Sequence, residues 1–219
     1  MDFKGKKAVF LGDSITEGHG TSGAEHIYVN LMKQRLGLSD VVNYGIGGTR
    51  IAKQQTPSAV ARHDLDFVSR VDEMDDNADL VVVFGGTNDF GHGDAPFGKL
   101  SDKTAGTFCG ACHELFEKLM NKYPQAQIVV MTPLHRSNED NPRGDGNKPE
   151  DVATLSEYVD AIKVIAKRFS IPVLDLFAVS GIQPKLEIMR EHFCPDGLHP
   201  NDAGHIRIAD RLEGFLKTL

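Results

Sequence analysis

Short, almost continuously apolar runs alternate with longer amphipathic segments along the chain. The apolar runs occupy residues 7–11, 41–44, 80–84, 127–131 and 172–176. Between them, apolar residues recur with a period of about 3.6 residues, which predicts helices with one buried face. These helical stripes cover residues 27–36, 108–119, 152–166 and 206–215. The pattern therefore predicts strands and helices in alternation.

Strands that alternate with helices are typically parallel and are joined by right-handed crossovers. Runs that are apolar at every position, rather than at every second one, indicate strands with both sheet faces covered. We therefore predict an α/β fold, a three-layer α/β/α sandwich around about five parallel strands. No internal repeat or low-complexity linker interrupts the chain, so residues 1–219 are expected to form a single domain.

Composition narrows the classes of function. The chain has 219 residues, of which 40% are apolar and 25% charged, as is usual for globular proteins. The formal net charge of −7 disfavours a nucleic-acid binder or a protein that binds anionic membranes, because both need a basic face. No apolar run approaches the ~20 residues that span a bilayer.

The N-terminus and the cysteines indicate the compartment. Three lysines precede the apolar run at residues 8–11, which is too short for the core of a secretory signal. The cysteines are Cys109, Cys112 and Cys194, an odd number that makes a poor disulfide framework. We therefore expect a cytoplasmic protein.

Two cofactor-like patterns lie in unsuitable positions. Residues 18–23 match G-x-G-x-x-G, but six residues separate them from the first strand. A dinucleotide-binding fold needs the first glycine in the turn that ends the strand. Cys109, Cys112 and His113 match a redox or haem motif, but they belong to an apolar helical stripe. We expect that helix to be capped near residues 101–104, which would remove the cysteines from its first turn.

Two clusters of metal-ligand residue types lack the spacing of a metal site. The histidines and the cysteine between residues 192 and 205 fit none of the usual zinc patterns. Residues 64–79 carry seven acidic side chains and one base, Arg70, without the order of a calcium loop. We expect neither a metal nor a cofactor, and we interpret the acidic segment as solvated surface.

Candidate chemistry begins at the ends of the predicted strands, where ligands bind in open parallel sheets. Ser14 follows the first strand and can face this edge, or it can simply cap a helix. Glycines within residues 43–49 follow the second strand and can present bare N–H groups to a ligand. Asn88 follows the third strand, so its amide can donate into the same cleft.

Asp196 and His199 precede the last helix. A spacing of three residues in a turn lets the carboxylate reach Nδ1 of the imidazole and leaves Nε2 free to accept a proton. These are the orienting group and the general base of a serine triad.

In this order, the segments resemble those of the SGNH (GDSL-type) hydrolase family, and the resemblance covers nearly the whole chain. It implies that the sheet is flavodoxin-like and that Ser14 is the nucleophile, His199 the base and Asp196 its partner. Ile15 stands where the family has leucine, a volume-conserving change.

The resemblance also implies an oxyanion hole. Its donors would be the Ser14 N–H, the Gly48 N–H and the side-chain amide of Asn88. Gly48 is chosen over Gly47 because it stands five residues after Asn43, the family's usual interval. Thr49 departs from the family, in which an acid is frequent at this position.

The implied activity is that of a serine esterase that forms an acyl-enzyme and needs no cofactor. Polar loops at residues 85–100 and 132–149 indicate a small ester with a short acyl group on a polar alcohol, such as an acetylated sugar. A lysophospholipase or thioesterase is the alternative within this class. A non-catalytic domain or a nucleotide-binding α/β domain is the alternative outside it.

Overall fold

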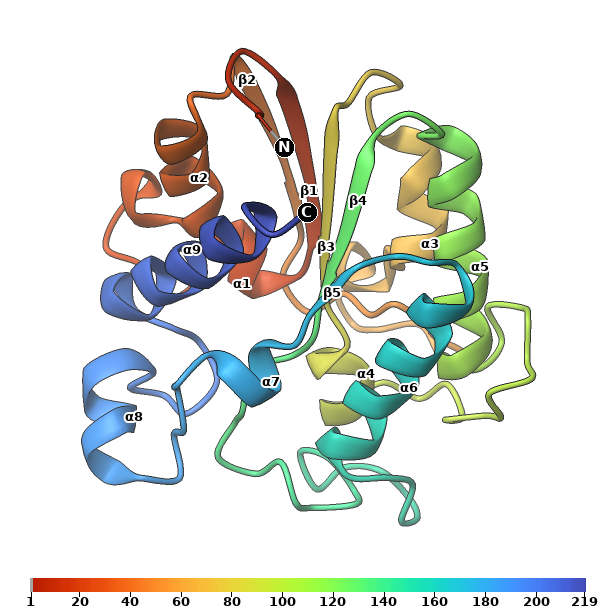
Figure 1. Cartoon of the computed structure of the whole chain (residues 1–219). Helices are drawn as coiled ribbons and strands as arrows, with labels where there is room; N and C mark the ends of the chain where they lie inside the picture. The colour runs from red at the N-terminus through yellow and green to blue at the C-terminus, as the bar shows by residue number, and fades with distance from the viewer. Residues whose placement is uncertain (1) are drawn as a thin grey trace.

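A five-stranded parallel sheet lies between two layers of helices in the computed structural model, which describes residues 2–219 (Figure 1). The strands are β1 (Lys7–Gly12), β2 (Asp40–Gly45), β3 (Leu80–Phe84), β4 (Gln127–Met131) and β5 (Val173–Leu174). Their order is β2-β1-β3-β4-β5, and every neighbouring pair is parallel. This is the flavodoxin-like order, and it confirms the predicted three-layer α/β/α fold.

Long helices occur where the sequence shows amphipathic stripes. They are α2 (Tyr28–Leu36), α5 (Phe108–Lys122), α6 (Leu155–Arg168) and α9 (Asp202–Leu216). Shorter ones, which the pattern did not predict, are α1 (Ser14–Glu17), α3 (Phe67–Arg70), α4 (Thr87–Gly91), α7 (Leu176–Val179) and α8 (Glu187–Phe193). A helix of one or two turns is too short to display a 3.6-residue period, so its sequence carries no such signal.

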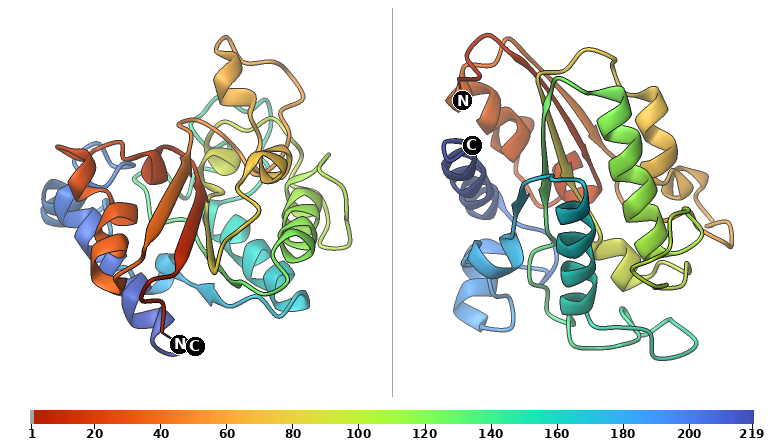
Figure 2. Two further views of the ribbon diagram at one scale, coloured as in Figure 1. Left: turned by 90° about the horizontal axis from the view of Figure 1, so that it is seen from above. Right: turned by 45° about the vertical axis from the view of Figure 1, so that its right-hand side comes forward.

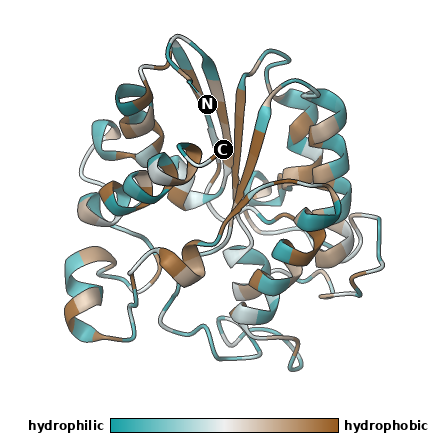
Figure 3. Cartoon of the chain, in the orientation of Figure 1, coloured by the Kyte–Doolittle hydropathy of each residue, from teal (hydrophilic) through white to brown (hydrophobic). Residues whose placement is uncertain are grey.

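The two helical layers cover opposite faces of the sheet. Helices α2 and α9 lie on one face, and α3, α5 and α6 lie on the other (Figures 1 and 2). Successive residues of β1 point to opposite layers: Val9 and Leu11 pack towards α5 and α6, whereas Ala8 and Phe10 pack towards α2 and α9. All four are fully buried, and the central strands are correspondingly hydrophobic in Figure 3. Burial on both faces explains why the strands are continuously apolar.

The fifth strand is shorter than the predicted run at residues 172–176. Only Val173 and Leu174 pair with β4. Pro172 has no N–H to give to a ladder. The Asp175 side chain accepts the Ala178 N–H at 3.2 Å and so starts α7 at Leu176. The strand therefore ends where this cap begins.

No helix within residues 2–219 combines the length and the apolar character that crossing a membrane requires.

Candidate active site

Three strands end level with one another at the edge where the predicted site residues lie. In the parallel register, Gly12 of β1 pairs with Gly45 of β2 and with Phe84 of β3. The segments that follow these residues carry the three predicted oxyanion donors, so all three start at one edge of the sheet. Helices α1 and α4 mark this edge, below the sheet in Figure 1.

Ser14 is the first residue of α1 and lies directly after β1. The side chain of Asp13 caps the helix by accepting the Ile15 N–H at 3.0 Å. The end of β2 packs tightly against α1, because a Cβ on Gly45 would lie only 2.1 Å from the Glu17 nitrogen. This close packing fixes the serine beside the loop that follows β2.

The structure brings Ser14, His199 and Asp196 together although the serine and the histidine are 185 residues apart. Ser14 Oγ lies 2.9 Å from Nε2 of His199, and Nδ1 of the same ring lies 2.7 Å from Oδ2 of Asp196. Asp196 Oδ1 accepts the backbone N–H groups of Leu198 and His199 at 2.8 and 2.6 Å. Burial opposes ionisation of Asp196, but these hydrogen bonds from His199 and Leu198 outweigh it and lower the pKa of the carboxyl. The result is an ionised carboxylate that can orient an imidazole.

The loop after β2 leaves the Gly48 N–H, rather than the Gly47 N–H, available to a ligand. Glu17 Oε2 accepts the Gly47 N–H at 2.6 Å. Gly48 has a φ of +75°, a conformation that glycine adopts at little cost. Neither the Gly48 N–H nor the Ser14 N–H has an acceptor within residues 2–219. Two backbone donors therefore remain free beside Ser14.

Helix α4 holds this loop from the other side. Nδ2 of Asn88 donates to the Thr49 carbonyl at 2.9 Å, which occupies one of its two protons and leaves the other without an acceptor within residues 2–219. The buried carboxylate of Asp89 accepts the N–H groups of Ile51 and Ala52, both at 2.9 Å. The donors are thus fixed before any substrate arrives, as electrostatic stabilisation of a transition state requires.

Arg70 ties the loop to the strands below it. Its guanidinium donates to the carbonyls of Tyr44 and Gly12 at 2.6 and 3.1 Å and to Thr49 Oγ1 at 3.0 Å. Burial lowers the pKa of Arg70 to about 10, so the group remains a cation at neutral pH. Burial raises the pKa of nearby Asp13 to about 7.

Sequence reasoning missed these supporting residues. It assigned Arg70 to a solvated acidic segment, but Arg70 is 3% exposed and belongs to the site, and Asp66 in the same segment is buried as the cap of α3. Glu17 and Asp89 each stand near a predicted site residue, but nothing in the sequence indicated which backbone groups they would bind.

The loop at residues 132–149 contacts the neighbouring segments through both side chains and backbone. Arg136 pairs with Asp145 and donates to the Thr87 carbonyl at 3.1 Å. The Ser137 N–H donates to the Gly197 carbonyl at 3.0 Å, within the turn that carries Asp196 and His199. The loop thus links α4 to that turn, and the charge of its buried Arg136 is paired with Asp145 of the same loop.

The redox-like cysteines lie nearer to a helix start than we expected. Helix α5 begins at Phe108, because Thr107 Oγ1 accepts the Gly110 N–H at 3.1 Å, so the expected cap near residues 101–104 is wrong. Cys109 therefore lies in the first turn. Burial nevertheless raises its pKa to about 11 and raises that of Cys112 well above its usual value. Thiolates are therefore disfavoured here, whereas redox chemistry needs a thiolate.

The other motifs have local uses. Gly18 ends α1 with a φ of +110°, and Gly20 packs where a Cβ would lie 2.4 Å from the Pro200 carbonyl oxygen. Both glycines of the G-x-G pattern therefore serve turns and packing. Within residues 2–219, no group of three or more His, Cys, Asp or Glu side chains is arranged to hold a metal ion.

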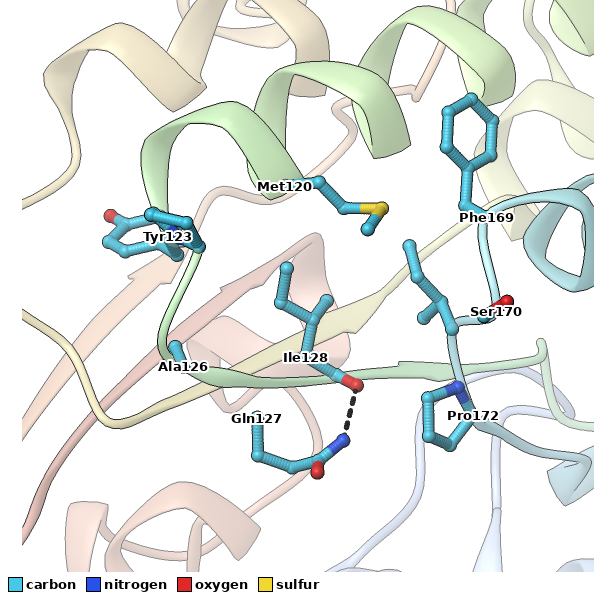
Figure 4. A pocket seen from close by; sticks show the side chains of 10 residues that line it. Met120, Tyr123, Ala126, Gln127, Ile128, Phe169, Ser170 and Pro172 are labelled. Atoms are coloured by element: carbon cyan, nitrogen blue, oxygen red, sulfur yellow. Dashed lines mark hydrogen bonds between the residues drawn. The ribbon is translucent and has the colours of Figure 1, made fainter.

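The pocket in Figure 4 lies at the opposite edge of the sheet from Ser14. Met120, Tyr123, Phe169 and Pro172 line it, near the amino ends of β4 and β5. The one hydrogen bond drawn runs from Gln127 Nε2 to the Ile128 carbonyl at 3.0 Å. The lining contains no histidine, carboxylate or amine that could act as a general base.

Comparison with known proteins agrees with the fold. The GDSL-like lipase/acylhydrolase family model matches residues 10–207. No curated protein matches the chain. One crystal structure is 35% identical, covers 100% of this chain and 99% of its own, and has a TM-score of 0.85. A Lactobacillus plantarum protein is 27% identical over 98% of both chains, with a TM-score of 0.84. The lipase/acylhydrolase from Enterococcus faecalis, 19% identical over 97% of this chain and 96% of its own, shares the fold with a TM-score of 0.66.

Proposed function

Because the chain belongs to the GDSL-like lipase/acylhydrolase family and is a hydrolase of ester bonds, we propose that Ser14, His199 and Asp196 form its catalytic triad. The observation that carries the proposal is the continuous hydrogen-bond chain from Ser14 Oγ through the His199 ring to Asp196. With these roles the protein is a serine esterase.

Acylation starts with proton transfer. Nε2 of His199 takes the Ser14 proton as Oγ attacks the ester carbonyl carbon. The carbonyl oxygen becomes an oxyanion and accepts hydrogen bonds from the Ser14 N–H, the Gly48 N–H and the free Asn88 amide proton. Each such donor is worth on the order of 3 kcal/mol in the transition state.

Collapse of the tetrahedral intermediate breaks the bond between the carbonyl carbon and the alcohol oxygen. The His199 imidazolium gives its proton to that oxygen, and the alcohol leaves. Water then attacks the acyl-enzyme with the same histidine as base, which releases the acid and restores Ser14. Asp196 stabilises the imidazolium in both halves of the reaction.

We propose a short acyl group on a polar alcohol as the substrate class. A polar side chain lies beside the proposed base: the His19 ring lies 5.5 Å from the His199 ring. Initial rates on acetyl and octanoyl aryl esters test the acyl length. Faster turnover of the acetyl ester is expected, and a clear preference for octanoyl would favour the lysophospholipase or thioesterase alternative.

Substitution Ser14→Ala tests the proposed function itself. We expect hydrolysis of 4-nitrophenyl acetate to fall to the rate without enzyme, because the His199 ring is hydrogen-bonded to no other hydroxyl or thiol within residues 2–219. The far-ultraviolet circular dichroism spectrum and the unfolding midpoint serve as controls for the fold. A Ser14→Ala protein that keeps wild-type turnover would show that the assignment is wrong.

A further inference from the structure

A second carboxylate–imidazole pair lies beside the proposed triad. Oε2 of Glu17 lies 3.2 Å from Nε2 of His19, and the same oxygen accepts the Gly47 N–H. The other oxygen of Glu17 pairs with Arg62. Although burial opposes it, these contacts with Arg62 and Gly47 lower the pKa of the Glu17 carboxyl. His19 is thus held against an ionised group.

His19 lies between His199 and Gly47 in the loop that follows β2. Its ring lies 5.5 Å from the His199 ring, and a Cβ on Gly47 would come within 3.3 Å of its Cε1 and Nε2. The base of an acyl-transfer triad protonates the leaving oxygen, so the alcohol must leave next to His199 Nε2. His19 therefore flanks the path of the leaving alcohol.

The chemistry of His19 suits a hydroxyl group. A carboxylate beside Nε2 favours the tautomer with its proton on that nitrogen, which leaves Nδ1 as an acceptor. Nδ1 makes no hydrogen bond within residues 2–219, and the side chain is 52% exposed. By contrast, the His199 side chain is 22% exposed and both its nitrogens are engaged.

A surface hollow is lined by residues that come shortly after His19 and His199 in the chain. Most of them are polar: Gly20, Thr21, Ser22, Asn201, Asp202 and Ala203. The two segments are packed together, because a Cβ on Gly20 would lie 3.3 Å from the Cβ of His199. An alcohol that extends beyond His19 would therefore meet polar groups.

We infer that His19, positioned by Glu17, binds the alcohol part of the ester and selects alcohols that carry a free hydroxyl near the ester oxygen. This inference rests on the proposed function and names the substrate group that the Ser14 site distinguishes. The hydroxyl donates its hydrogen bond to His19 Nδ1 while His199 protonates the neighbouring leaving oxygen.

Two esters that share the acyl group and the length of the alcohol test the inference. Glycerol 1-monoacetate carries two free hydroxyls, and propyl acetate carries none. We expect wild-type enzyme to have the higher kcat/KM for glycerol 1-monoacetate. The replacement His19→Phe keeps a ring but removes the acceptor, so the ratio of the two kcat/KM values should fall about fivefold, as loss of one hydrogen bond predicts.

Two further variants separate binding from a merely structural effect. His19→Asn keeps an acceptor near the position of Nδ1 and should retain more of the ratio than His19→Phe. His63→Phe changes a histidine on the Gly48 side of the site and should move the ratio less than twofold. A structural disturbance would lower kcat/KM for both esters alike and leave the ratio in place.

Hydrolysis of 4-nitrophenyl acetate separates failure of the proposed function from failure of the subsite assigned to His19. If wild-type enzyme hydrolyses none of the three esters, the proposed function fails and the subsite assignment fails with it. If the aryl ester is hydrolysed but the ratio stays within twofold of wild type in His19→Phe, only the subsite assignment is overturned. The subsite assignment is also overturned if His63→Phe lowers the ratio as much as His19→Phe.

Discussion

At the residue scale, Asn88 combines a structural contact with a proposed role in the chemistry. It gives one amide proton to the Thr49 carbonyl, and the other has no acceptor within residues 2–219. In Asn88→Ala, we expect kcat for 4-nitrophenyl acetate to fall by about 10²–10³, with KM little changed, because an oxyanion donor acts mainly in the transition state. Steady-state kinetics measure the two constants separately.

If kcat falls less than tenfold, or if only KM changes, Asn88 is not an oxyanion-hole donor. The unfolding midpoint of Asn88→Ala serves as the control, because the variant also loses the bond to Thr49. A changed unfolding midpoint with an unchanged kcat would show that Asn88 only stabilises the loop.

Residues whose chemistry is local could be predicted from the sequence, and residues that act through distant backbone groups could not. Asp196 and His199 are three positions apart, so their contact follows from the turn. Glu17 binds the N–H of a residue 30 positions away, and Arg70 binds a carbonyl 58 positions away. Such contacts depend on the tertiary fold, and one sequence without its structure does not indicate them. The catalytic roles of the predicted residues remain predictions.

Arg70 matters at the scale of elements because it joins the ends of β1 and β2 to Thr49 in the loop that follows β2. Substitution Arg70→Met would remove the side-chain donor from the Tyr44 carbonyl and from Thr49 Oγ1, and would leave the Gly12 carbonyl with the Ile46 N–H alone. We expect the free energy of unfolding to fall by about 3 kcal/mol, the cost of burying unsatisfied polar groups. Urea denaturation with an unchanged m-value measures this loss.

Arg70→Lys is the matched variant. A lysine keeps the charge but lacks the planar fork that reaches three acceptors, so an intermediate loss of stability is expected. An ordinary surface substitution changes the free energy of unfolding by up to about 0.5 kcal/mol. If the free energy of unfolding of Arg70→Met lies within this range of the wild-type value, Arg70 does not hold these elements together.

Element types followed from periodicity, whereas several boundaries followed from caps. The apolar stripe identified α5, but the helix starts at Phe108 because Thr107 supplies the capping oxygen. Ser101, Asp102 and Thr104 are equally good capping residues by type, so composition alone did not choose between them. Similarly, Asp175 ends β5 early by capping α7.

His205 couples the stability of the whole molecule to pH. It is fully buried in α9, and its Nδ1 accepts the Tyr28 N–H at 3.1 Å. Burial lowers the pKa of His205 to about 4, whereas an unfolded histidine takes up its proton near pH 6.5. Between these values the unfolded state binds more protons, so the free energy of unfolding falls as the pH falls. The loss is about 3 kcal/mol over this window.

The comparison of wild type with His205→Asn isolates this contribution. Asn keeps an acceptor for Tyr28 but does not titrate. Asp13 acts in the opposite sense, because its raised pKa favours folding at low pH, but it does so in both proteins. The stability advantage of wild type should therefore shrink by about 3 kcal/mol between pH 7 and pH 4. A difference that does not vary with pH would rule out the titration of His205.

Part of the acidic charge behind the net value of −7 is paired with lysines away from Ser14. Exposed acids such as Asp72, Asp76 and Asp79 lie near the amino ends of the strands, where they pair with Lys118, Lys122 and Lys6. Ser14 lies at the opposite edge. Net charge read from composition therefore does not describe the surface that a substrate meets.

Labelling with a fluorophosphonate probe tests the central claim most directly, because the probe forms a covalent bond only with an activated serine. The nucleophilic Oγ would attack phosphorus and displace fluoride. Mass spectrometry of the digested protein should find one modified residue, Ser14, and no label in Ser14→Ala. Labelling of another serine, or no labelling of a protein that hydrolyses esters, would contradict the account.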